Sequence, residues 1–72
     1  MAANIHVMMS KDGGWDVKRD GAVRASGNFE TQEEAIEFAE EEGKRYSVEV
    51  FIHGEDGKIR KREAFGKKLY PG

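Results

Sequence analysis

Two histidines, three serines and fourteen carboxylates are the side chains of this sequence whose chemistry could serve a reaction or hold a metal. A serine nucleophile needs a base within hydrogen-bond reach and a third group that orients the base. Ser10, Ser26 and Ser47 fall in turn, strand-end and strand-start contexts, and no strand–turn–helix elbow presents any of them. No catalytic residue is therefore predicted, and we expect a protein that is not an enzyme.

The two histidines offer at most part of a metal site. His6 and His53 occupy corresponding points of two predicted strands, so neighbouring strands would bring them together, with Glu49 as a third ligand. No triplet of ligands is spaced for zinc, and the chain has no cysteine. The loop at Asp56 and Gly57 lacks the further oxygen ligands of a calcium loop. We therefore expect no metal, no cofactor and no small-molecule substrate.

A basic strip near the C-terminus is the candidate for contact with nucleic acid. Between Lys58 and Lys68 six residues are basic and only Glu63 is acidic. An edge strand carries the same kind of charge to discourage unwanted pairing, and the net charge of −2 is unlike that of typical nucleic-acid binders. Basic residues expected to contact phosphates, from this strip and from the N-terminal strands, are Lys18, Arg19, Arg24, Arg60, Lys61 and Arg62.

Three strands are expected to open the chain. Alternation of apolar and polar side chains predicts strands over residues 4–9 and 15–19. The pair Asp20–Gly21 favours a tight two-residue hairpin, which would lead directly into a third strand over residues 22–26. In that strand Val23 is expected to point into the core.

One helix follows the strands. Thr31 can cap its N-terminus, with Glu34 three residues on to complete a capping box, and Gly43 lies where a left-handed terminus would fall. The predicted helix runs from Thr31 to Glu42. It carries six acidic residues and no basic one, and its narrow apolar stripe can cover only one face of a sheet.

The C-terminal half adds two strands and a tail. Residues 46–53 are rich in β-branched side chains and predict a strong strand, whereas residues 58–64 predict a charged strand at a sheet edge. Residues 65–72 are aromatic and basic and are expected to pack on the sheet or at an interface. The fold class is therefore α+β, in the order β-β-β-α-β-β, with one helix on a largely antiparallel sheet. The expected core is Ile5, Val7, Trp15, Val17, Val23, Phe29, Ala35, Phe38, Ala39, Val48, Val50 and Ile52.

The second face of the sheet is expected to be only partly polar. A helix covers one face, so the other should be polar in a solvated monomer, yet this face includes large apolar side chains. Either the C-terminal tail folds back over them or they meet a second copy of the chain or another protein. The expected interface residues are His6, Met8, Phe51, Phe65 and Tyr70.

Length and composition indicate the number of domains, the lack of membrane contact and the cellular compartment. A chain of 72 residues fills one small core, so residues 1–72 are expected to form a single domain. No apolar run approaches the ~18 residues of a membrane span, so no membrane contact is expected. The absence of cysteine fits a cytoplasmic protein.

Short motifs along nearly the whole chain are similar, in order and spacing, to those of a known family. They are His6-Val7, Gly14-Trp15-x-Val17-Lys18, Arg24-Ala25-Ser26, Thr31-x-x-Glu34-Ala35, His53-Gly54-x-Asp56-Gly57-x-Ile59 and Gly66 followed by Tyr70-Pro71. The chain resembles the small prokaryotic proteins grouped as domain of unknown function 2188. This resemblance implies a stand-alone single-domain protein and implies no catalytic or ligand residue.

A looser resemblance covers residues 14–42. Their strands and sheet-to-helix junction resemble the three-stranded DNA-binding domains of phage-type integrases and plant ethylene-response factors. That resemblance implies a sheet face presenting Lys18, Arg19 and Arg24 to DNA, from which this chain departs by adding two strands and by placing Asp16 among the basic residues. The predicted function is a binding or interaction module that self-associates, with DNA binding as the alternative.

Overall fold

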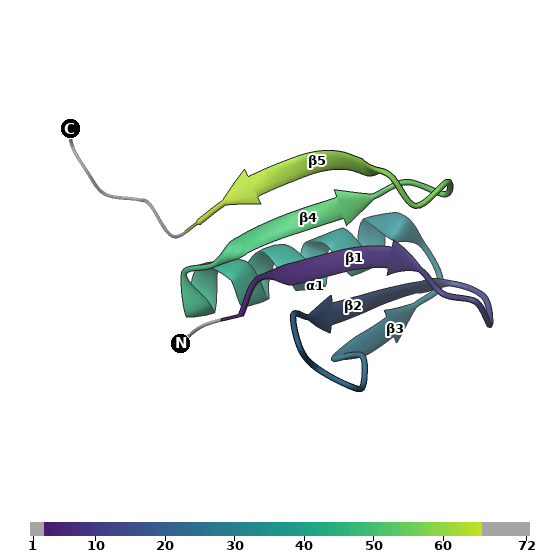
Figure 1. Ribbon diagram of the computed structural model, residues 1–72, viewed down its shortest axis with the longest axis horizontal. Helices are drawn as coiled ribbons and strands as arrows, with labels where there is room; N and C mark the ends of the chain where they lie inside the picture. Colours follow the sequence, from purple (N-terminus) through teal and green to yellow (C-terminus); the bar gives the residue numbers. More distant parts are fainter. Residues whose placement is uncertain (1–2, 66–72) are drawn as a thin grey trace.

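The computed structural model describes residues 3–65, which form five strands and one helix in the predicted order (Figure 1). The elements are β1 (Ile5–Met9), β2 (Trp15–Arg19), β3 (Gly27–Phe29), α1 (Gln32–Tyr46), β4 (Glu49–His53) and β5 (Ile59–Ala64). Within these residues no helix is long and apolar enough to cross a membrane.

The strands form one mixed sheet with the helix on one face. Their spatial order is β3-β2-β1-β4-β5, and three of the four pairings are antiparallel. β1 and β4 pair in parallel at the centre of the sheet, because α1 carries the chain back before β4 begins. The α+β class and the edge position of β5 are confirmed, and the sheet is mixed at its centre.

Both ends of α1 depend on particular residues. The backbone N–H of Glu34 donates to Thr31 Oγ1 at 3.2 Å, which confirms the predicted cap. The helix continues four residues beyond the predicted end, and Ser47, with φ of 55°, takes the left-handed position expected for Gly43. Gly43 is instead buried inside the helix, where an added Cβ would lie 2.7 Å from both Phe65 and Val50. This glycine permits close packing and does not end the helix.

The core lies between α1 and the sheet. Among residues 3–65 it contains nine buried side chains, all predicted from the sequence: Ile5, Val7, Trp15, Val17, Ala35, Ala39, Val48, Val50 and Ile52. Phe29, Ile36, Phe38 and Phe65 pack against them and are partly buried.

The third strand forms, but its predicted position at residues 22–26 is wrong, because the strand lies at Gly27–Phe29. Residues 20–26 form a loop, and Val23 is 91% exposed instead of buried. The turn itself forms, since the N–H of Ala22 donates to the carbonyl of Arg19 at 3.0 Å, but pairing resumes only at Gly27. That register places Phe29 beside Phe38, with ring centroids 5.2 Å apart. Burying the larger aromatic side chain of Phe29 stabilises the fold more than burying Val23 would.

Candidate functional site

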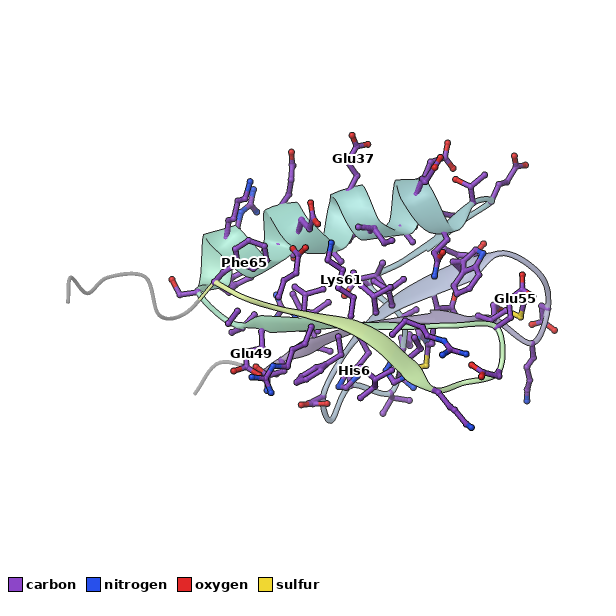
Figure 2. The ribbon with its side chains drawn as sticks, turned by 90° about the horizontal axis from the view of Figure 1, so that it is seen from above. His6, Glu37, Glu49, Glu55, Lys61 and Phe65 are labelled. Atoms are coloured by element: carbon purple, nitrogen blue, oxygen red, sulfur yellow. The ribbon has the colours of Figure 1, made fainter. Side chains whose placement is uncertain are left out.

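The sheet face away from α1 gathers most of the polar and aromatic side chains singled out in the sequence. We call this surface the open face. Figure 2 shows His6 and Glu49 on this side of the sheet, with Lys61 and Phe65 on the α1 side. Strand alternation and register assign the open face to Asp16 and Lys18 of β2, His6 and Met8 of β1, Glu49, Phe51 and His53 of β4, and Arg62 of β5.

One row of the open face crosses four strands. The register pairs His6 with Lys18 on one side and with Phe51 on the other, and Phe51 with Arg62. The rings of His6 and Phe51 are stacked, with centroids 5.2 Å apart and planes inclined by 21°. Two aromatic rings therefore lie between two cationic side chains at the middle of the sheet.

A chain of hydrogen bonds runs through both histidines. His6 Nε2 lies 2.6 Å from Asp20 Oδ1, and His6 Nδ1 lies 3.1 Å from His53 Nε2. His53 Nδ1 in turn lies 3.2 Å from the carbonyl oxygen of Gly57. All four ring nitrogens are thus engaged, two of them with each other.

Each outer ring nitrogen faces a hydrogen-bond acceptor. The Asp20 carboxylate and the Gly57 carbonyl only accept, so these two hydrogen bonds place a hydrogen on His6 Nε2 and on His53 Nδ1. The two inner nitrogens, His6 Nδ1 and His53 Nε2, face each other.

Two shallow hollows flank the histidine pair. One, of about 340 Å³, is lined by His6 and His53 together with Met8, Lys18, Arg19, Asp20, Gly21 and Ala22. The other, of about 510 Å³, is lined by Met8 and His53 and by residues of the β1–β2 and β4–β5 turns. Both histidines are therefore reachable from solvent.

The residues predicted to bind nucleic acid do not form one surface. Arg19 turns toward α1, where its guanidinium lies 4.3 Å from the centre of the Tyr46 ring, and Lys61 also lies on the α1 side. Lys18 and Arg62 share the open face, while Arg24 lies in the loop 20–26.

Four of the six predicted basic residues are paired with acidic neighbours. These ion pairs are Arg19–Glu42 at 3.6 Å, Arg60–Asp56 at 2.7 Å, Lys61–Glu63 at 3.1 Å and Arg62–Glu49 at 4.0 Å. Within residues 3–65, neither Lys18 nor Arg24 forms an ion pair. The basic strip seen in the sequence is therefore largely neutralised along β5.

The predicted interface residues divide between the two sides of the sheet. His6, Met8 and Phe51 share the open face and are partly exposed. Phe65 does not join them, because it packs against the core from the α1 side, where it fills the space left by the missing side chain of Gly43. Tyr70 lies outside the described residues.

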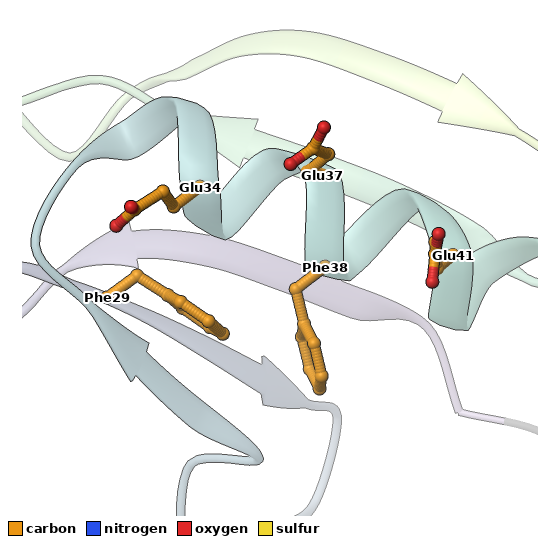
Figure 3. A pocket seen from close by; sticks show the side chains of 5 residues that line it. All are labelled: Phe29, Glu34, Glu37, Phe38 and Glu41. Carbon is orange, nitrogen blue, oxygen red and sulfur yellow. The ribbon is translucent and has the colours of Figure 1, made fainter.

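A second hollow surface lies on the helix side of the molecule. Figure 3 shows Phe29 and Phe38 below Glu34, Glu37 and Glu41, which together line a hollow of about 490 Å³ beside α1 and β3. The sequence predicts the acidic side chains as a solvated helix face. The structure adds an apolar floor beneath them.

Glu40 lies in an acidic pair between α1 and β5. Its pKa is raised above the ordinary value, first by partial burial and then by a shared hydrogen bond with, and repulsion from, the Glu63 carboxylate. Lys61 and Lys44 oppose the rise. This pair lies on the α1 side and is remote from the open face.

A known protein family matches the part of the chain that forms this fold. Residues 5–65 match the family model described as Uncharacterized protein conserved in bacteria (DUF2188). The chain belongs to this family. The matched segment begins at β1 and ends at Phe65, so the DUF2188 domain includes every element of the sheet and the helix. The resemblance seen in the sequence motifs is confirmed.

A curated relative shares much of the domain. Uncharacterized protein YdaT of Bacillus subtilis (strain 168) is 40% identical over 57 residues, which are 79% of this chain. The chain spans 37% of the length of that relative. No solved structure matches the chain.

Proposed function

We propose that this DUF2188 domain is a non-enzymatic interaction module that self-associates by packing its open face against the open face of a second copy. The observation that supports this proposal is that Met8 and Phe51 lie partly exposed at the middle of a sheet face that α1 does not cover. A large apolar group on an uncovered sheet face is stabilised when a second surface removes it from water.

The edges of the sheet are poor sites for association. β3 is only three residues long, and β5 is fully charged over four consecutive residues from Arg60 to Glu63. Short and charged edge strands resist pairing with another chain. The open face is therefore the better surface for contact.

The charges of the open face favour a second copy over a strongly charged partner. Asp16 and Glu49 carry negative charge, and Lys18 and Arg62 carry positive charge. Two charges of each sign let the face meet itself without net repulsion, as a two-fold interface requires.

Light scattering coupled to gel filtration tests the proposal. The wild-type chain should elute with twice the monomer mass, and Phe51→Asp and Met8→Lys should each reduce it to the monomer mass. Val23→Asp is the matched control, because it replaces a 91% exposed residue outside the open face and should leave the dimer intact. Circular dichroism should show that all the variants are folded. A wild-type monomer at every concentration would overturn the proposal.

The same protein samples test the alternative function, DNA binding. If the alternative holds, a monomer should be retained on duplex DNA at low salt and released steeply as salt rises. The paired state of Arg19, Arg60, Lys61 and Arg62 leads us to expect no retention.

A further inference from the structure

The two histidines of the open face bring one ring nitrogen of each side chain close together. We infer that His6 Nδ1 and His53 Nε2 chelate one divalent transition metal ion of the class that imidazole binds, such as Zn²⁺, Ni²⁺ or Cu²⁺. The two nitrogens lie 3.1 Å apart. Two nitrogens bound to one zinc ion at ~2.0–2.1 Å in tetrahedral geometry lie ~3.3 Å apart. The ion lies between these two nitrogens.

The outer nitrogens have the partners that metal-binding histidines need. A histidine that binds metal through one nitrogen usually donates its other N–H to a carboxylate or a backbone carbonyl, which fixes the tautomer and the ring orientation. His6 Nε2 lies 2.6 Å from Asp20 Oδ1, and His53 Nδ1 lies 3.2 Å from the Gly57 carbonyl. Both rings are thus held with their remaining nitrogens facing each other.

The sheet makes this pair rigid. The parallel register places His6 beside Phe51, two residues before His53, and the His6 ring stacks on Phe51 with centroids 5.2 Å apart. Ligands on neighbouring strands keep their spacing without a loop having to close around the metal.

Solvent can reach the chelate and complete its coordination. Both rings line the same hollow of about 340 Å³, and the His6 side chain is 22% exposed. Within residues 3–65 no group of three ligand side chains lies together, so water fills the remaining positions. A metal with two protein ligands and open positions can accept a donor atom from another molecule.

Titration of the purified chain with Zn²⁺ tests this inference. His6 and His53 are the only histidines of the chain, so ¹⁵N signals from imidazole report on these two rings alone. Zinc should shift His6 Nδ1 and His53 Nε2 strongly, while His6 Nε2 and His53 Nδ1 keep their hydrogens. Calorimetry should give one ion per chain.

Variants separate a chelate from general surface binding. His6→Gln and His53→Gln should each weaken zinc binding by more than the ~10-fold that loss of an outer partner costs, and Asp20→Asn should weaken it by about 10-fold. Asp16→Asn is the matched control, because this carboxylate shares the open face and binds Asn28 instead of a histidine, and it should leave the affinity unchanged.

Two outcomes would overturn the chelate. Zinc binding that survives either histidine substitution would assign the metal to other residues. One ion for every two chains would show that the ligands come from two copies, whereas failure of the dimer in light scattering would leave the single-chain chelate standing.

Discussion

The two faces of the sheet differ in character, although each strand contributes side chains to both. On β4, Val50 and Ile52 point toward α1 and are 0% and 3% exposed, whereas Phe51 between them points to the open face and is partly exposed. We call the side of the sheet that faces α1 the covered face. Every buried side chain on the covered face is apolar, and within residues 3–65 no polar side chain is buried. The open face instead has hydrogen-bonded histidines and paired charges. Strand alternation thus places the core-forming face and the proposed interaction face on the two sides of one strand.

The largest expected effect comes from the covered face. Ile52→Ala should lower the free energy of unfolding by ~2–5 kcal/mol, because it leaves a cavity beneath α1. Phe51→Ala, one residue away, should cost less than half as much, because its side chain is already partly exposed in the folded protein. Urea denaturation measures both.

The milder Ile52→Val should cost ~0.5–1.5 kcal/mol and serves if the alanine variant does not fold. Equal losses for the alanine variants at positions 51 and 52 would show that the open face contributes to the core as much as the covered face does.

The substitution Gly43→Ala tests how closely α1 packs against the covered face. Alanine favours helix, yet its Cβ would lie 2.7 Å from both Phe65 and Val50, so we expect a loss of ~1–3 kcal/mol from overpacking. Thermal or urea denaturation measures this loss. Glu41→Ala, exposed on the same helix, is the control and should change stability little.

The packing of Phe65 can be checked with a double variant. Adding Phe65→Ala to Gly43→Ala should cost less than the sum of the two single changes, because the smaller side chain makes room for the new methyl group. Additive losses would show that Phe65 does not pack against Gly43.

The smallest expected effect concerns the acidic pair between α1 and β5. Because the pKa of Glu40 is raised in the folded state, its contribution to stability is fully present below the ordinary value of 4.5 and is lost as pH rises through the raised pKa. Glu40→Gln should therefore stabilise the protein at pH 7 by ~0.5 kcal/mol, and this gain should vanish once the pH is below 4.5.

Unfolding by urea at both pH values measures the difference. Glu37→Gln, exposed on the same helix, is the control and should show no such pH-dependent gain. A gain of equal size in the control would attribute the effect to the net charge of the helix and not to Glu63.

The sequence predicts the core better than the open face. All nine buried side chains follow from alternation and helix periodicity, which act over a few residues. Contact between His6 and His53 depends instead on the parallel pairing of β1 with β4, which no local pattern specifies. Asp20 reads as a turn residue, and only the folded hairpin brings it to His6.

Two local predictions fail for tertiary reasons. The alternation around Val23 is real, but the strand that packs best brings Phe29 to the core and leaves Val23 in a loop. Gly43 has the residue type of a helix terminator, but its position beneath Phe65 requires a residue without a side chain. In both cases packing against a distant element overrides a correct local signal.

The central pairing of β1 with β4 also has a consequence for the rate of folding. Ile5 lies beside Val50, so the middle of the sheet joins residues 45 positions apart in the chain. Closing so long a loop costs chain entropy before its contacts are gained, and such non-local contacts slow folding. The β1–β2 hairpin and α1 can form early from local contacts, so we expect docking of β4 against β1 to limit the rate of folding.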